Sequence, residues 1–143
     1  DVTEEIRTPK VASIVSKIAA LKAVRIKLVE QQQAMGSQGG IVMDGRDIAS
    51  VVFPNAEFKL FVLASDEVRT QRRLAELQAK GETMNEADVL ANLKSRDLQD
   101  STREESPLIQ VPDAIVLDTS AHTRETQLEW ALEIANQLIE ETE

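Results

Sequence analysis

The stretch "FKLFVLASDE", residues 58–67, is a short, mostly apolar run that ends in small and acidic residues. Two other stretches have the same pattern, "GIVMDGRD" over residues 40–47 and "DAIVLDTSA" over residues 113–121. Continuous apolar runs are typical of strands that are buried on both faces of a parallel sheet. Because helical patterns lie between the runs, we expect an α/β protein whose parallel sheet is flanked by helices.

Apolar residues at helical spacing predict the helices that accompany these strands. Residues 8–35 are predicted to form two helices with a break near Leu21. Residues 66–80 predict another helix, which ends at Gly81 because glycine readily adopts the backbone that closes a helix.

The remaining helical signals lie later in the chain. Thr83 and Glu86 have the spacing of a capping box, which predicts the start of the next helix. Leucines, isoleucine and alanines spaced along residues 128–139 predict an amphipathic C-terminal helix. The loop "GSQGG", residues 36–40, precedes the first apolar run and has no lysine after it, so it is not a phosphate-binding P-loop.

Composition narrows the possible functions. The chain has 143 residues, of which 42% are hydrophobic, as expected for one globular domain. It has no cysteine, which excludes disulfides and thiolate metal sites and favours a reducing, cytoplasmic location. No apolar run has membrane-spanning length, so no membrane partner is expected. The formal charge of −9 argues against binding to a nucleic-acid polymer, although locally convergent arginines would still suit a small anion.

Charged residues replace an apolar stripe in "EADVLANLKSRDLQDSTRE", residues 86–104. Arg96, Asp100 and Arg103 follow one another at offsets of four and three, so they lie along one helix face. Two interpretations remain open at this point. The face either directs charge at a ligand, or it is an exposed helix end with intrahelical ion pairs.

Further arginines occur where an α/β protein places its ligand. Arg46 follows the first apolar run, and ligands of such sheets bind beyond the carboxyl ends of the strands. Arg25 lies on the second predicted helix. A guanidinium group gives phosphate two charge-assisted hydrogen bonds, so these residues favour a phosphorylated small molecule. Three more arginines lie on the helix that follows residue 65, namely Arg69, Arg72 and Arg73.

Four stretches together resemble bacterial cytidylate (CMP) kinases. They are "MDGRDIASVVFPNAEFKLFVLAS", "VRTQRRLAELQAKG", "LKSRDLQDSTREESPL" and "DAIVLDTS". The combination of Gly-Arg-Asp, Val-Val-Phe-Pro and Arg-Asp-x-x-Asp-x-x-Arg is specific, whereas each motif alone is not. The resemblance implies a nucleoside monophosphate kinase with the P-loop kinase fold. Such an enzyme transfers the γ-phosphoryl group of ATP to CMP or dCMP, with Mg²⁺, to give CDP or dCDP.

The resemblance also implies roles for individual residues. The cytosine is expected to bind Ser16, Arg25 and Asp47. Arg96 and Asp100 are expected at the ribose and the acceptor phosphate, and Arg46 and Arg103 at that phosphate. Arg69, Arg72 and Arg73 are expected on a mobile lid that reaches the ATP phosphates. The catalytic residues implied are Arg46, Arg72 and Arg96, and Asp44 is the candidate for an indirect Mg²⁺ contact.

The loop that follows the third apolar run has two interpretations. By the resemblance, Thr119 and Ser120 border the adenine pocket of the donor nucleotide, and an ordinary turn is equally compatible with their sequence. His122, the only histidine of the chain, is predicted to be a solvated loop residue and not a catalytic base.

The family begins with a strand and a Gly-rich loop that ends Gly-Lys-Ser/Thr, and the 143 residues contain no such motif. We therefore expect a partial domain, incomplete at its N-terminus and inactive alone. Its expected parts are 1–38 in the acceptor-binding region, 39–65 with the core strands, 66–106 as lid helices and 107–143 as C-terminal core. A monomer is expected for the full-length family, whereas an unpaired strand edge in a fragment would favour self-association. Two alternatives stay open: a natural pyrimidine-nucleotide-binding module without turnover, and a kinase for another nucleoside monophosphate.

Overall fold

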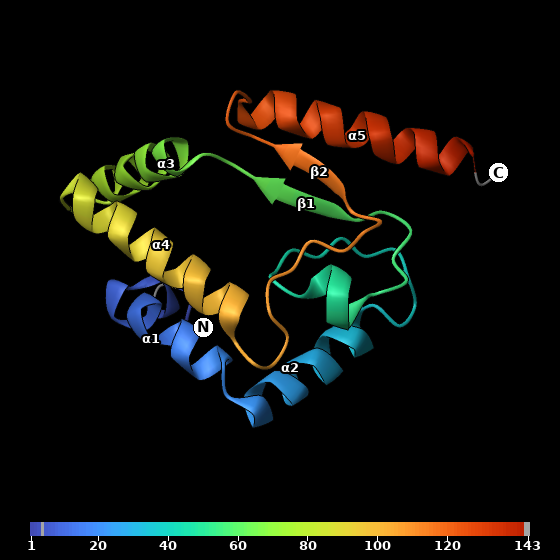
Figure 1. The fold of residues 1–143 in the computed structure, drawn as a ribbon, viewed down its shortest axis with the longest axis horizontal. Coiled ribbons are helices and arrows are strands. Elements are labelled where there is room, and N and C mark those ends of the chain that lie inside the picture. Colours follow the sequence, from blue (N-terminus) through green and yellow to red (C-terminus); the bar gives the residue numbers. More distant parts are fainter. Residues whose placement is uncertain (4, 142–143) are drawn as a thin grey trace. The chain divides into compact units, whose positions relative to one another are not determined.

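A computed structural model of the protein describes residues 1–3 and 5–141, with the side chains of residues 7, 9, 10, 12, 13 and 16 outside the description. Its elements appear in chain order in Figure 1: η1 Glu5–Arg7, α1 Pro9–Ala19, α2 Lys22–Met35, η2 Ile48–Val52, β1 Leu60–Leu63, α3 Asp66–Ala79, α4 Glu86–Thr102, β2 Ile115–Asp118 and α5 Arg124–Glu140. The chain forms two compact units. Unit 1 contains residues 1–55 and 94–109, and unit 2 contains residues 56–93 and 110–143. Helix α4 contributes residues to both.

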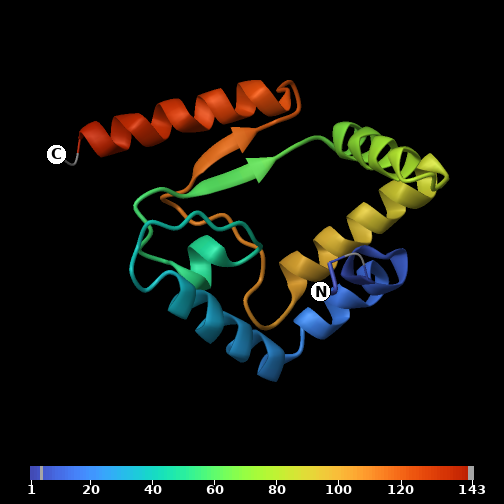
Figure 2. The same cartoon turned by 180° about the vertical axis from the view of Figure 1, so that it is seen from behind.

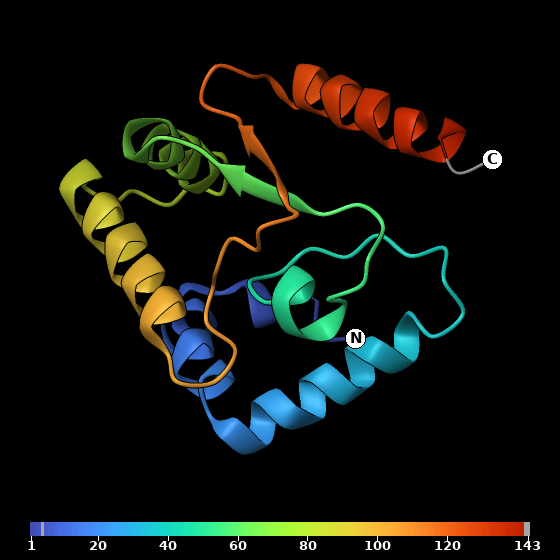
Figure 3. The same cartoon turned by 45° about the vertical axis from the view of Figure 1, so that its right-hand side comes forward.

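Unit 1 begins with the two predicted helices, α1 and α2, which pack against each other (Figure 3). The predicted break near Leu21 is confirmed. Leu21 has an extended backbone with φ −69° and ψ 123°, and its carbonyl accepts the first hydrogen bond of α2 from Arg25 N at 2.9 Å. Arg25 is buried on this helix, whereas the next residue, Ile26, is exposed.

The predicted strand over residues 40–47 is wrong. Residues 41–44 have no regular structure, and Val42 is fully exposed. A parallel strand is stable only when a neighbouring strand accepts and donates along its edge, and no described strand pairs with this segment. The apolar run alone therefore did not decide its conformation.

A single turn of π-helix, η2, follows this segment and packs on α2. Gln33 Nε2 donates to Val52 O at 3.2 Å, which connects the two elements. The end of η2 also lies close to the end of α2, because a Cβ added to Gly36 would stand 2.4 Å from Cζ of Phe53. π-Turns are rare and occur often at functional sites, so this one directs attention to the residue that precedes it, Asp47.

Unit 2 contains the sheet, in which β1 and β2 run parallel with Leu60 opposite Ile115 and Leu63 opposite Asp118. Figures 1 and 2 show the two strands side by side from both sides. The predicted α/β class with a parallel sheet is confirmed. The prediction that its strands are buried on both faces is wrong, because Val62 is largely exposed. In a two-stranded sheet, each strand has a single hydrogen-bonded neighbour. The described helices leave part of the surface of the two strands uncovered.

The helix that follows β1 confirms its prediction. Helix α3 begins after Ser65, whose hydroxyl accepts from Val68 N at 3.3 Å, and it ends just before Gly81, where φ is +74°. A positive φ suits glycine because an L side chain would clash with the backbone there.

The capping box predicted for α4 is wrong. The helix begins at Glu86, and the Asn85 side chain accepts from Ala87 N at 2.8 Å. Asn85 directly precedes the first helical residue, so its short carboxamide reaches an unpaired N–H of the first turn, whereas Thr83 lies too early in the chain. The predicted C-terminal helix is confirmed as α5, which a capping box of Thr123 and Thr126 begins.

Burial differs between the two units. The buried apolar residues in the described part of unit 2 are Leu77, Val89 and Leu117, whereas in the described part of unit 1 only Val52 is in that class. Unit 2 also buries one charged residue, Lys59, whereas the described part of unit 1 buries three, namely Arg25, Asp47 and Asp100. Charged groups are almost never fully buried unless they are paired, so these three require an explanation. None of the described helices is long and apolar enough to cross a membrane.

Candidate functional site

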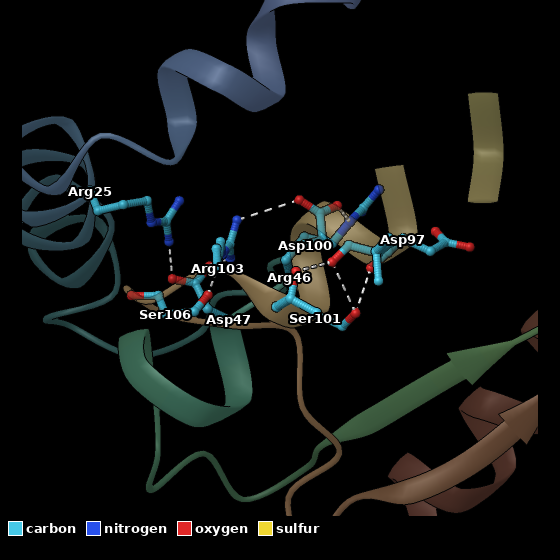
Figure 4. Close-up of polar contacts among 10 residues, drawn as sticks. Arg25, Arg46, Asp47, Asp97, Asp100, Ser101, Arg103 and Ser106 are labelled. Carbon is cyan, nitrogen blue, oxygen red and sulfur yellow. Dashed lines mark hydrogen bonds and ion pairs between the residues drawn. The ribbon is translucent and has the colours of Figure 1, made fainter. Parts of the chain in front are cut away.

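Asp47 is the most deeply buried acid of the candidate site, with a side chain that is 4% exposed. Its backbone is held by η2, because its carbonyl accepts from Val51 N at 2.9 Å and from Val52 N at 3.1 Å. Its carboxylate forms a hydrogen-bonded ion pair with Arg25 Nη2 (Figure 4). The other carboxylate oxygen lies 3.8 Å from Arg103 Nη2. Three segments far apart in the sequence therefore meet at one carboxylate.

Asp100 joins two further guanidinium contacts near the end of α4. Arg46 Nε donates to Asp100 Oδ2 at 3.0 Å, and Arg103 Nη1 lies 3.5 Å from Asp100 Oδ1. The Arg103 side chain is only 8% exposed, whereas that of Arg46 is 49% exposed. Together with the first pair, these residues form a cluster of Arg25, Arg46, Asp47, Asp100 and Arg103 (Figure 4). The cluster is open to solvent at Arg46, whereas the other four side chains are at most 11% exposed.

The interpretation of this helix face as an exposed end with intrahelical pairs is wrong. The Asp100 side chain is 11% exposed, and its shorter contact is with Arg46, which precedes it by 54 residues. Arg103 lies just beyond the last residue of α4 and also contacts Asp47. The charges therefore belong to a tertiary cluster, which sequence spacing alone left undecided.

Positive charge exceeds negative charge in the cluster, since three guanidinium groups face two carboxylates. This holds although the whole chain has a formal charge of −9. Burial lowers the pKa of Arg25, and the nearby charge of Arg103 lowers it further. Burial also lowers the pKa of Arg103, an effect that Asp100 opposes. Both shifts arise mainly from burial, because removing a guanidinium group from water disfavours its charged form.

Several buried N–H groups of the site have no hydrogen-bond acceptor within the described part of the chain. They are Arg25 Nε, Arg103 Nη2 and Arg96 Nε. Arg96 lies one turn before Asp100 on α4, as the helical spacing predicted. A buried donor without an acceptor is costly, and a bound anion with several acceptor oxygens would satisfy such groups.

Neither Ser16 nor Asp44 is part of the described cluster. Ser16 lies on α1, but its side chain is outside the described part of the chain. Asp44 is exposed, and no group of three histidine or acidic side chains suited to a metal ion occurs among the described residues.

The predicted lid arginines belong to unit 2, where each has a partner within the protein. Arg69 pairs with Asp66 at 2.7 Å, and Arg73 pairs with Glu76 at 3.0 Å. Arg72 donates to Thr119 Oγ1 at 3.0 Å and to the carbonyls of Thr119 and His122 at 2.7 and 3.1 Å. Arg72 thus connects α3 to the loop that follows β2.

That loop also ties the ends of the two strands together. Thr119 is buried, and both its N–H and its hydroxyl donate to Leu63 O, at 2.8 and 2.9 Å. Ser120 Oγ accepts from Ser65 N at 2.8 Å and donates to Asp118 at 2.6 Å. These hydrogen bonds build a turn across the carboxyl ends of β1 and β2, the edge at which α/β sheets bind ligands.

The comparison with known families decides the relationship. The family model described as "Cytidylate kinase" matches residues 1–137 of the chain. The chain belongs to the cytidylate kinase family. The resemblance predicted from the four sequence stretches is therefore confirmed.

Individual cytidylate kinases support the same assignment. The chain is 58% identical to one from Parabacteroides distasonis over 133 residues, 93% of this chain and 58% of that protein. It is 51% identical to one from Flavobacterium johnsoniae over 139 residues, 97% of this chain and 60% of that protein. A third, from Bacteroides thetaiotaomicron, is 50% identical over 141 residues, 99% of this chain and 62% of that protein. The chain thus spans about three fifths of the length of the cytidylate kinases it matches.

Sequence reasoning missed one contact of this cluster. Arg103 Nε donates to the carbonyl of Ser106 at 2.5 Å, and Ser106 has a positive φ of 53°. The sequence offers only a weak signal for it, since Ser-Pro at residues 106–107 indicates a turn but not a left-handed backbone.

Proposed function

We propose that this chain carries the acceptor side of a cytidylate kinase, which transfers the γ-phosphoryl group of ATP to CMP or dCMP to give CDP or dCDP. The observation that carries the proposal is the buried cluster in which three guanidinium groups face two carboxylates while some donors lack acceptors. Burying ion pairs gains little stability and is often worse than an apolar core, so such a cluster is better explained by a ligand. A nucleoside monophosphate supplies both the anion and the missing acceptors.

The base is proposed to bind at the buried side of the cluster. Asp47 would accept from the exocyclic amine of cytosine, and Arg25 would donate to the ring acceptors next to it. Arg25 has the required spare donor, because its Nε is buried without an acceptor among the described residues. Ser16 is proposed as a third contact with the base, because the resemblance to the family implies this role.

The phosphate is proposed to bind toward the open side. Arg46 and Arg103 would hold its oxygens, since a guanidinium fork matches phosphate geometry. Arg96 and Asp100 would contact the ribose hydroxyls and the phosphate region. Asp100 has a second task in this arrangement, because its contacts with Arg46 and Arg103 set the spacing of those two cations.

The donor side is proposed to involve the arginines of α3, namely Arg69, Arg72 and Arg73, with Arg46, Arg72 and Arg96 as catalytic residues. Phosphoryl transfer depends mainly on positioning and on neutralising charge, which arginines supply. Each arginine of α3 would first have to exchange its present partner for a phosphate oxygen. ATP is the proposed phosphoryl donor and Mg²⁺ the proposed metal, with Asp44 as an indirect metal contact. Mg²⁺ bound to ATP would add positive charge at the phosphoryl group that is transferred.

The 143 residues alone are proposed to bind CMP without turning it over, because no Gly-Lys-Ser/Thr sequence occurs among them. The second candidate function is therefore a nucleotide-binding module that binds CMP without turnover. Turnover of ATP and CMP by these 143 residues with Mg²⁺ would contradict this second candidate. A cytoplasmic location and a monomeric full-length protein complete the proposal.

Calorimetric titration with CMP, UMP and AMP tests the acceptor assignment. CMP should bind about tenfold more tightly than UMP, because UMP carries a carbonyl where Asp47 requires a hydrogen-bond donor. Equal affinities for CMP and UMP would instead favour a kinase for another acceptor. Absence of binding for all three nucleotides would refute the proposed function.

A pair of variants tests the cluster directly. Arg46→Gln should weaken CMP binding about tenfold with little cost in stability, because Arg46 is half exposed and its ion pair is worth about 1 kcal/mol or less. Lys27→Gln is the control, since Lys27 is exposed and pairs with Glu30 within α2. Unchanged affinity in Arg46→Gln would remove the phosphate from this side of the cluster.

A further inference from the structure

Ser106 has a left-handed backbone, with a φ of 53° that no other non-glycine residue in the described part of the chain shares. L residues rarely adopt this conformation because Cβ approaches the following carbonyl. The following residue is Pro107, which further restricts the conformations open to Ser106. A strained backbone persists only where surrounding contacts hold it, and such residues cluster at functional sites.

The left-handed backbone of Ser106 positions its carbonyl to accept a hydrogen bond from the Arg103 side chain. Ser106 O accepts from Arg103 Nε at 2.5 Å (Figure 4). A guanidinium group is planar, so fixing Nε fixes the plane and leaves Nη1 and Nη2 to the site. Those two nitrogens are the ones that face Asp100 and Asp47. The backbone of Ser106 therefore decides where the Arg103 guanidinium points.

Two more contacts hold the segment of residues 103–108 in place. Leu108 N donates to Asp100 O at 2.8 Å, which folds the chain back onto the last turn of α4. Lys22 Nζ lies 2.5 Å from Glu105 Oε1, which ties the segment to the first residue of α2, the helix that carries Arg25. The segment is thus connected to both helices that supply the cluster.

An ordinary helix cap does not account for Ser106. A left-handed capping residue follows the last helical residues directly, and its N–H bonds to a carbonyl of the helix. Helix α4 ends at Thr102, four residues before Ser106, and the group that Ser106 contributes is a carbonyl that receives a side chain. The contact concerns Arg103 and not the end of the helix.

We propose that Ser106 is a positioning residue of the acceptor site: its left-handed backbone holds the Arg103 guanidinium ready for the phosphate of a nucleoside monophosphate. This inference rests on the proposed function for the identity of the ligand. The arrangement of Ser106 and Arg103 itself does not require a ligand. Because the Arg103 side chain is already held in one rotamer, it loses little conformational entropy when the anion binds, and this raises the affinity for the anion.

The test compares two substitutions at position 106 in the full-length protein. Ser106→Gly keeps the positive φ without strain and should bind CMP as tightly as the wild type. Ser106→Val opposes that φ, because a β-branched residue is a poor fit to the left-handed region, and should weaken CMP binding about tenfold. Ser37→Val, the same change at an exposed loop residue outside the cluster, should leave CMP affinity unchanged.

A second background shows whether the effect acts through Arg103. In Arg103→Lys, which lacks the Nε donor and the planar fork, Ser106→Val should weaken CMP binding less than about twofold further. An equal tenfold loss in both backgrounds would overturn the proposal, because Ser106 would then act independently of Arg103. Equal affinity of Ser106→Val and the wild type would overturn it as well.

An NMR measurement without nucleotide separates this inference from the proposed function. The Arg103 Nε–H signal, assigned by its loss in Arg103→Lys, should keep its position and slow exchange in Ser106→Gly and lose both in Ser106→Val. A signal that stays the same in all the serine variants would overturn the proposal whatever binds. If the wild type binds no CMP but the Ser106 variants show the expected NMR changes, the proposed function is overturned and the positioning of Arg103 by Ser106 is supported.

Discussion

Replacing Asp47 with Asn tests how the cluster is held together, since it removes one charge with almost no change of shape. The Asp47 carboxylate is buried, as are the side chains of Arg25 and Arg103 that face it. In the variant, the amide group of Asn would still accept from one arginine through its oxygen. The charge of Arg25 would lose the carboxylate with which it forms its ion pair.

The expected loss of stability follows from these contacts. Removing one partner of a buried ion pair costs about 3–5 kcal/mol, because the other charge stays buried without compensation. Arg103 adds little to the loss, since its contact with Asp47 is 3.8 Å long and it keeps Asp100 at 3.5 Å. For a domain of this size, about 3 kcal/mol corresponds to a fall in Tm of about 10 °C.

A double-mutant cycle in urea makes this prediction refutable. Arg25→Met should also lower the free energy of unfolding, because it leaves Asp47 with a weaker partner. The double variant Arg25→Met/Asp47→Asn should lose at least about 2 kcal/mol less than the sum of the single variants, since neither charge then remains unpaired. Losses that add to within about 0.5 kcal/mol would refute the reasoning, because the two residues would then not stabilise each other.

Three other predictions concern packing, the loop after β2 and pH. Arg72→Met removes three hydrogen bonds to that loop and should cost about 1–3 kcal/mol with faster loop hydrogen exchange, whereas unchanged exchange would mean that other contacts hold the loop. Gly36→Ala puts a Cβ 2.4 Å from Phe53 Cζ and should cost about 1–3 kcal/mol in urea unfolding; a neutral result would mean that the ring moves freely. The Asp118 carboxylate accepts from the hydroxyl and the N–H of Ser120, which lowers its pKa below the ordinary 3.8. The ionised carboxylate therefore stabilises the folded protein above pH 3.8, and this contribution is lost as the pH falls through the lowered pKa. Urea unfolding from about pH 5 to about pH 2 should show a smaller loss in Asp118→Asn, and identical pH profiles would contradict the assignment.

Local patterns were sufficient for most helices of this protein. The break near Leu21, the end of α3 before Gly81 and the amphipathic C-terminal helix α5 were all predicted from spacing and end signals. These features depend on residues close in sequence, whose hydrogen bonds and caps form within one segment. The one helix start that was placed wrongly, that of α4, differs by the choice between neighbouring capping residues.

Strands were predicted less well, because their stability depends on partners elsewhere in the chain. The runs at β1 and β2 pair with each other in parallel, as expected. The run over residues 40–47 has a similar sequence and no strand partner among the described residues, and the structure instead forms η2 after it. Apolar residues mark where a strand is possible, but only a neighbouring edge makes it favourable.

The sequence by itself determined the class of the protein, its family resemblance and the residues worth testing, since motifs and helical spacing are properties of the chain alone. Tertiary structure alone decided how the charges combine. It brings Arg25, Asp47 and Asp100 together from separate segments, and it bends the backbone at Ser106 so that its carbonyl holds Arg103. The reason is physical: the energy of a buried charge depends on which opposite charges and acceptors lie within a few ångströms, and folding sets those distances.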